Sequence, residues 1–167
     1  MDLRAVQQPL KDTYRADPDQ ARITLTARGS GIDGPIACNV DLGRAIYEAQ
    51  AHTGVGGAGT AACSGDLLLG ALAACAQITC QMVATAMGLD VRSIETTVEG
   101  DLDLRGTLGL DREVGAGFDA IRLRFRVDAP AATDEDLDAL LSKTERYCTV
   151  AQTLMTPPGL DVGLMRS

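Results

Sequence analysis

The chain has 167 residues, which is enough for one domain and too few for two ordinary ones. Its 15 basic and 23 acidic residues give a net charge of −8, and this balance argues against DNA or RNA as the main partner. Hydrophobic residues make up 46% of the chain but aromatic residues only 3%, so we expect a core of small aliphatic side chains that pairing with a second subunit would enlarge. The first residues lack the basic-then-apolar pattern of a signal peptide, and we therefore expect a cytoplasmic protein.

The first third of the chain is expected to hold strands and loops. Residues 23–27 alternate between apolar and polar side chains, and a glycine-rich turn at 28–34 separates them from a second alternating run at 36–40. Two such runs around a turn predict a β-hairpin. A short helix is expected at about 44–51, and the four glycines among residues 54–59 predict a loop.

A long helix is expected from Ser64 to Met87. Ser64 is a suitable N-cap, Asp66 in the first turn suits the helix dipole, and Gly88 is a natural stop signal. Its side chains are apolar almost all round, which is typical of a central, buried helix. Four polar residues interrupt this stretch and favour a core helix over a membrane span: Gln77, Thr79, Gln81 and Thr85.

The second half of the chain predicts two more strands and a second long helix. Strands are expected at 94–104 and 118–127, joined by a glycine-rich loop at 105–117; in the later strand, apolar residues alternate with arginines. Thr133 is the expected N-cap of the second helix, whose apolar stripe ends at Cys148. The other members of that stripe are Leu137, Leu140, Leu141 and Thr144.

Residues 160–165 predict a last strand, which completes the order β-β, helix, β-β, helix, β. This order is typical of an α+β fold in which antiparallel β-hairpins pack on two long apolar helices. We expect a single domain over residues 1–167, with an N-terminal arm at 1–20.

The cysteines are the main candidates for chemistry. They are Cys38, Cys63, Cys75, Cys80 and Cys148, an odd number that does not predict a structural disulfide framework. Taken alone, Cys75 and Cys148 are each typical of a small core residue. However, each lies on the inward face of a long helix, and if the two helices pack together the thiols could meet and form a disulfide.

The other three cysteines predict different roles. Cys80 lies about 140° around the helix from Cys75 and is expected in the core, as is Cys38 on the apolar face of its strand. Cys63 immediately precedes a helix N-terminus, where the dipole could activate its thiol, and it is a secondary candidate.

Other kinds of site find little support in the sequence. His52 is the only histidine, and no Cys-x-x-Cys or comparable spacing predicts a metal site. A serine hydrolase motif Gly-x-Ser-x-Gly is absent, and the glycine-rich loop lacks the Lys-Ser/Thr ending of a phosphate loop. We therefore expect no bound cofactor or metal.

Two segments of the chain resemble the OsmC/Ohr family. In that family a glycine-rich loop precedes an acidic residue, a Leu/Ala helix and the cysteine that attacks peroxides; the matching segments here are Gly57-Ala58-Gly59-Thr60 and Ser64-Gly65-Asp66 through Ala73-Ala74-Cys75. The segment Glu145-Arg146-Tyr147-Cys148-Thr149-Val150 resembles the family's second cysteine motif. The order of elements also matches, over residues 20–165.

The resemblance implies an intertwined homodimer with active sites at the subunit interface. It implies that Cys75 is the peroxide-attacking thiolate and that Cys148 resolves its sulfenic acid to a disulfide. An external dithiol, of the lipoyl type, would then reduce the pair. The expected partners are a second copy of the chain, a small peroxide and this dithiol, without nucleic acid or membrane.

The resemblance also implies an acidic residue and an arginine near the thiolate. Asp66 is the best acidic match, but it lies about 900° around the helix from Cys75, so it could reach a thiol only across the dimer interface. Its alternative role is that of a first-turn helix residue. Arg28 is the first choice for the arginine and Arg44 the second; each could equally be a surface residue.

Two departures place the chain closer to a less characterised branch of the family. Ser64-Gly65-Asp66 stands where the hydroperoxide-reductase branch has an Asn-Pro-Glu type segment, and Thr149 stands where that branch has proline. Our leading hypothesis is a thiol-dependent peroxidase that reduces organic hydroperoxides in oxidative-stress defence. The alternatives are a non-enzymatic protein that binds a small apolar ligand, and a redox sensor without turnover.

Overall fold

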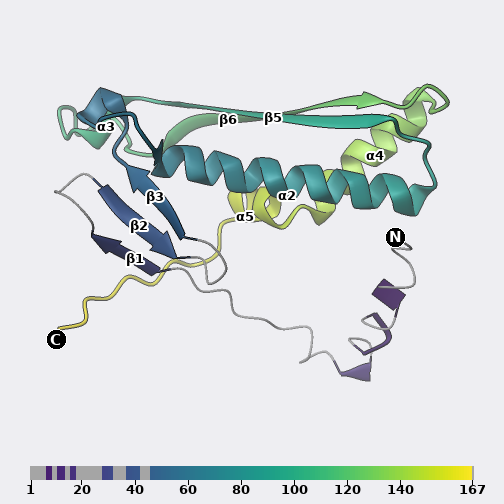
Figure 1. Ribbon diagram of the computed structural model, residues 1–167, viewed down its shortest axis with the longest axis horizontal. Coiled ribbons are helices and arrows are strands. Elements are labelled where there is room, and N and C mark those ends of the chain that lie inside the picture. The colour runs from purple at the N-terminus through teal and green to yellow at the C-terminus, as the bar shows by residue number, and fades with distance from the viewer. Residues whose placement is uncertain are drawn as a thin grey trace. The chain divides into compact units, whose positions relative to one another are not determined.

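A computed structural model of the protein describes residues 7–8, 11–13, 16–17, 28–31, 37–41 and 46–166, with the backbone alone for 28–31 and 37–41 (Figure 1). The named elements, in chain order, are β1 (Arg28–Gly31), β2 (Ala37–Asp41), β3 (Ile46–Gln50), η2 (Thr53–Val55), β4 (Ala62–Cys63), α2 (Ser64–Met87), β5 (Ser93–Leu102), α3 (Leu104–Thr107), β6 (Phe118–Asp128), α4 (Asp134–Tyr147) and α5 (Thr149–Met155). This mixture of helices and antiparallel strands confirms the predicted α+β class.

The chain forms two compact units. The first consists of Met1–Gly70 and Val98–Leu123, and the second of Ala71–Thr97 and Arg124–Ser167. Within the first unit, four strands form a sheet in the order β1-β2-β3-β4. The first two pairings are antiparallel, and β3 pairs with β4 in parallel.

The predicted hairpin is present, but its first strand lies later in the chain than expected. Arg28 pairs with Asp41 and Gly31 with Cys38, so residues 28–31 are a strand, not part of the turn. Their glycines suggested a turn, yet β1 is an edge strand, where glycine is tolerated and the pairing with β2 supplies the hydrogen bonds. The run at 23–27 lies outside the described residues.

The helix expected at 44–51 is wrong, because Ile46–Gln50 is strand β3. This strand lies between β2 and β4 and forms backbone hydrogen bonds with both, which overrides the helix propensity of its alanine and glutamate. The predicted glycine loop is confirmed: after the single turn of η2, Gly56 and Gly59 adopt positive φ angles of 94° and 72°. The short strand β4 was not predicted.

Strands β5 and β6 form a two-stranded antiparallel sheet. Arg122 of β6 bonds Glu99 and Asp101 of β5, whereas Arg126, farther along β6, bonds Glu95 nearer the start of β5. The predicted alternation in β6 is confirmed, with its arginines on the charged outer face and Phe125 and Val127 partly buried on the other. The predicted loop after β5 is confirmed in part, because it also contains the short helix α3.

Helix α2 has the predicted bounds and carries the core of the second unit, where it lies along β5 and β6 (Figure 1). A buried cluster consists of Cys80, Val83, Ala84 and Leu140. Gln77 attaches the helix to β5, because its Nε2 donates to the Ile94 carbonyl (2.8 Å) and its Oε1 accepts from the Thr96 hydroxyl (2.6 Å).

The prediction that α2 is buried all round is wrong within one chain. Ile78 is 55% exposed and Met82 39%, and Leu141 of the predicted α4 stripe is 51% exposed. By length and composition α2 could also cross a membrane, but core helices pass the same test, so this is weak support for a span.

The start of helix α4 agrees with the prediction, whereas the residues after it differ from the prediction. Thr133 caps α4 in a capping box with Asp136, as expected, but helix α5 was not predicted. Residues 157–166 form neither helix nor strand, so the expected last strand at 160–165 is wrong; its apolar side chains are more than four-fifths exposed. Within the described residues, no neighbouring strand supplies hydrogen bonds to this segment.

Candidate functional site

Cys75 and Cys148 lie together in the second unit, and each thiol shifts the pKa of the other. Cys75 is half-buried in the middle of α2, and Cys148 is completely buried. Cys148 has φ −74° and ψ 104°, an extended conformation that ends α4 and begins α5. The break between the helices thus places a second thiol against Cys75.

The same break directs two backbone N–H groups at the Cys75 sulfur. They belong to Thr149 and Val150, the first residues of α5, whose N–H groups have no partner within their own helix. The Thr79 hydroxyl is a further donor that lowers the pKa of Cys75. The sulfur therefore has several neutral hydrogen-bond donors around it.

These contacts shift the pKa values of the two thiols in opposite directions. Burial by itself raises the pKa of Cys75, but the hydrogen bonds from Val150, Cys148, Thr79 and Thr149 together outweigh it and hold this pKa below its ordinary value. Burial raises the pKa of Cys148, and the neighbouring Cys75 raises it further. Of the two thiols, Cys75 is therefore the stronger acid.

Cys80 occupies a contrasting place in the same helix. It is 2% exposed in the apolar cluster, and burial raises the pKa of its thiol more than a hydrogen bond with Thr144 lowers it. A thiol that keeps its proton in an apolar core is chemically inert, so the prediction of a core role is confirmed.

Cys63 and Asp66 form the cap of α2, and the prediction that Ser64 is the N-cap is wrong. The Cys63 N–H donates to Asp66 Oδ2 (2.9 Å), and the Asp66 N–H donates to the Cys63 sulfur (3.4 Å), which is a capping box. Cys63 holds this position because it ends β4 and its extended backbone brings the sulfur to the first helical turn.

The hydrogen bond from the Cys63 backbone is the main cause that lowers the pKa of Asp66; the Cys63 side chain and the charge of His52 lower it too. Of the two roles open to Asp66, the first-turn helix role is the one seen in this chain. Its role at a dimer interface stays a prediction.

The side chains of the two predicted arginines, Arg28 and Arg44, lie outside the described part of the structure. The Arg28 backbone lies in β1, and its side chain is outside the described residues. Arg44 also lies outside them, as does the Cys38 side chain.

Sequence reasoning missed three residues of the site: Thr79, Thr149 and Val150. Thr79 carried a readable signal, because residues four apart share a face of a helix and Thr79 follows Cys75 at that spacing. The two N–H donors carried none, because they depend on the break at Cys148.

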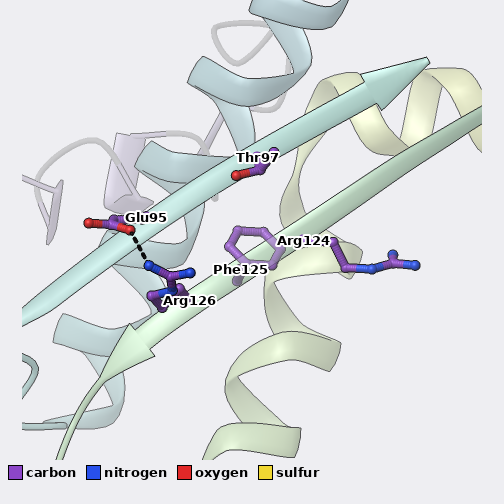
Figure 2. A pocket seen from close by; sticks show the side chains of 5 residues that line it. All are labelled: Glu95, Thr97, Arg124, Phe125 and Arg126. Atoms are coloured by element: carbon purple, nitrogen blue, oxygen red, sulfur yellow. Dashed lines mark hydrogen bonds and ion pairs between the residues drawn. The ribbon is translucent and has the colours of Figure 1, made fainter.

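Two hollows lie elsewhere on the second unit. One, of about 310 Å³, is lined by residues of β5 and β6, among them Phe125 and the ion pair of Glu95 with Arg126 (3.5 Å) (Figure 2). The other, of about 500 Å³, lies along α4 and α5 between Leu141 and Gln152. Neither is lined by a cysteine. Within the described part of the chain, no three His, Cys, Asp or Glu side chains are grouped to hold a metal ion.

Comparisons with known proteins agree with this fold. The family model of OsmC-like proteins matches residues 57–162. An OsmC-like protein from Mycoplasma pneumoniae is 16% identical, with a TM-score of 0.68 over 81% of this chain and 89% of that one. An organic hydroperoxide resistance protein OsmC from Legionella pneumophila is 18% identical, with a TM-score of 0.63 over 80% and 90%. The organic hydroperoxide resistance protein OhrB of Bacillus subtilis is 17% identical, with a TM-score of 0.52 over 81% and 93%. No curated protein matches this sequence.

Proposed function

This chain belongs to the OsmC-like protein family, and we propose that it is a thiol-dependent peroxidase that reduces organic hydroperoxides. The observation that carries this proposal is the contact between two chemically different thiols. Cys75 has a lowered pKa and partial exposure, as an attacking thiolate requires, whereas Cys148 is adjacent, buried and has a raised pKa, as suits a resolving thiol.

The reaction would proceed in three balanced steps. The Cys75 thiolate attacks the terminal peroxide oxygen, the O–O bond breaks, and the alkoxide takes a proton to leave as an alcohol, so that Cys75 becomes a sulfenic acid. The Cys148 thiol then attacks the Cys75 sulfur, and water leaves as the disulfide forms. An external dithiol, for which a lipoyl-type compound is our candidate, finally reduces the disulfide and becomes oxidised itself.

The neutral donors around Cys75 suit this sequence. Hydrogen bonds from the Thr149 and Val150 N–H groups stabilise the thiolate before attack, without a bound metal or cofactor. The same fixed donors would face any oxygen added to the sulfur.

We propose a homodimer as the functional form. Ile78, Met82 and Leu141 expose large apolar side chains in one chain, and a second copy of the chain would bury them. Light scattering in solution should give twice the mass of one chain, and a monomer at all concentrations would contradict the proposal. In the dimer, Asp66 and Arg28 remain our candidates for the charged residues near the thiolate.

The decisive experiment counts thiols in the reduced protein before and after one equivalent of cumene hydroperoxide, and maps any disulfide by peptide analysis. We expect rapid loss of two thiols and a Cys75–Cys148 peptide, followed by recovery of both thiols with dihydrolipoamide. The variant Cys80→Ala is the matched control, because it removes a thiol of the same helix that lies in the core, and it should behave like the wild type.

Each alternative predicts a different result. A redox sensor would lose the two thiols without efficient recovery by a dithiol. A protein that only binds an apolar ligand would keep all its thiols over minutes, and that outcome would remove the peroxidase proposal.

A further inference from the structure

Cys148 joins helices α4 and α5 at a bend. Its φ of −74° is close to helical, but its ψ of 104° is far from the helical value of about −40°. Its N–H donates to the Thr144 carbonyl (2.9 Å), and its own carbonyl accepts from the Gln152 N–H (2.9 Å). Cys148 therefore ends one helical pattern and begins the next, and its side chain does not cap α5.

The bend removes the usual partner of a carbonyl in α4. In a continuous helix, the Glu145 carbonyl accepts from the N–H four residues later, which belongs to Thr149. The ψ angle of Cys148 sets the direction of that N–H and, at 104°, turns it away from the α4 carbonyls. The side chain of Gln152 supplies a donor in its place, because its Nε2 donates to the Glu145 carbonyl at 2.9 Å.

The bond from Gln152 to Glu145 crosses the bend, since its two ends lie on either side of Cys148. By contrast, the Thr153 hydroxyl donates to the Thr149 carbonyl (2.8 Å) within α5, whatever the angle between the two helices. In a continuous helix, residues 145 and 152 would be about 10 Å apart along the axis, and the backbone would occupy the carbonyl. The Gln152 bond therefore stabilises the bent conformation relative to a continuous helix.

We propose that Gln152 is a positioning residue, whose bond to the Glu145 carbonyl holds the bend that keeps the Cys148 thiol beside Cys75. Cys148 is completely buried and Gln152 is exposed, so Gln152 acts on the thiol through the backbone of the bend. A disulfide forms only where two sulfur atoms meet, and the bend therefore favours it. This role rests on the proposed function of Cys148 as a resolving thiol, but the disulfide itself can be formed without peroxide.

The test measures the equilibrium of the reduced protein with mixtures of reduced and oxidised glutathione. The Cys75 and Cys148 thiols lose two electrons and two protons to one oxidised glutathione, which yields the protein disulfide and two reduced glutathione molecules. Peptide mass spectrometry after acid quenching gives the fraction of protein with this disulfide. That fraction, at known glutathione concentrations, gives the effective concentration of one thiol at the other.

Four variants separate the Gln152 bond from other effects. Gln152→Met keeps the length of the side chain and removes the donor, and Gln152→Lys restores a donor on a long side chain as the rescue variant. Thr153→Val is the matched control, because it removes a hydrogen bond of α5 that does not cross the bend. Gln152→Glu, whose carboxylate only accepts, repeats the test if Gln152→Met folds poorly.

We expect Gln152→Met to lower the effective concentration about fivefold, the effect of one net hydrogen bond, because the bent conformation loses its bond across the bend. Gln152→Lys and Thr153→Val should keep the wild-type value. An unchanged value for Gln152→Met, an equal fall for Thr153→Val, or an equal fall for Gln152→Lys would each overturn the proposal. A wild-type protein that forms no Cys75–Cys148 disulfide in any glutathione mixture would overturn it as well.

This test is independent of peroxidase activity. A lower effective concentration in Gln152→Met supports the role of Gln152 even if cumene hydroperoxide leaves the thiols intact, in which case the proposed function alone fails. An unchanged value overturns the role of Gln152 even if the protein reduces peroxides efficiently.

Discussion

Cys75 and Cys80 lie five residues apart in one helix, and their pKa values are shifted in opposite directions. Cys80 packs in the apolar cluster with Leu140, where burial decides its state and raises its pKa. Cys75 is also partly buried, yet hydrogen bonds from the start of α5 and from Thr79 outweigh this burial and lower its pKa. The comparison teaches that donors at the break between two helices, rather than exposure alone, distinguish a thiol with a lowered pKa from one with a raised pKa.

The largest expected effect is a difference between Cys75 and Cys80 in their reaction with peroxide. Cys75→Ala should reduce oxidation by cumene hydroperoxide to background, because it removes the only thiol for which we propose a stabilised thiolate, whereas Cys80→Ala should keep the wild-type rate. Stopped-flow measurement of peroxide consumption checks both variants. Comparable losses in the two would show that the environments do not determine reactivity.

The next effect concerns the partner thiol. Cys148→Ala should let Cys75 react with one equivalent of peroxide and then stop as a sulfenic acid, because no adjacent thiol can displace its oxygen. Dimedone labelling followed by mass spectrometry should find the adduct on Cys75, and turnover with dihydrolipoamide should fall. A new disulfide from Cys75 to Cys80 or Cys63 in this variant would contradict the contact described here.

Substitution of Cys80 should cost more stability than substitution of Cys75, the opposite of the order expected for reactivity. Cys80→Ala leaves a small cavity in the buried cluster and should lower the free energy of unfolding by about 1–2 kcal/mol, whereas Cys75→Ala, at a half-exposed position, should cost less. Urea denaturation followed by circular dichroism checks this prediction. Equal costs would mean that the two sites are packed alike.

The smallest effect is expected at the start of α2, where Asp66 belongs to a helix cap. Asp66→Asn should lower the free energy of unfolding by about 0.5 kcal/mol, the low end for a cap, because this side chain is exposed and screened by solvent. The pKa of Asp66 is lowered in the folded protein, so its stabilisation is present above the ordinary aspartate pKa and is lost as the pH falls through the lower folded value.

Acid denaturation of Asp66→Asn should therefore be less steep than that of the wild type in this range. Asp136→Asn, in the capping box of α4, is the matched control and should change stability in the same direction. Because Asp66 is also our candidate for the active site of the dimer, Asp66→Asn should lower peroxide reactivity, whereas Asp136→Asn should not. Unchanged reactivity in both variants would limit Asp66 to its role in the helix cap.

The helices were readable from the sequence because their signals are local. Continuous apolar character up to Gly88 predicted α2, and the Thr133 cap with its acidic first turn predicted α4. The alternation of β6 was equally plain. The residues alone did not decide whether Cys75 contacts Cys148 or whether each is a core residue. Only the resemblance to a family implied the pair.

Tertiary structure decided what depends on partners distant in sequence. Ile46–Gln50 is a strand because β2 and β4 lie on either side of it, against its own helix propensity. Residues 160–165 have the apolar alternation of a strand, but the described chain offers them no neighbour. The low pKa of Cys75 arises where α4 stops and α5 begins, because that break brings unpaired N–H groups to a sulfur 73 positions earlier in the chain. Local patterns determine where helices form, whereas hydrogen bonds between distant segments determine which thiol has the lowered pKa.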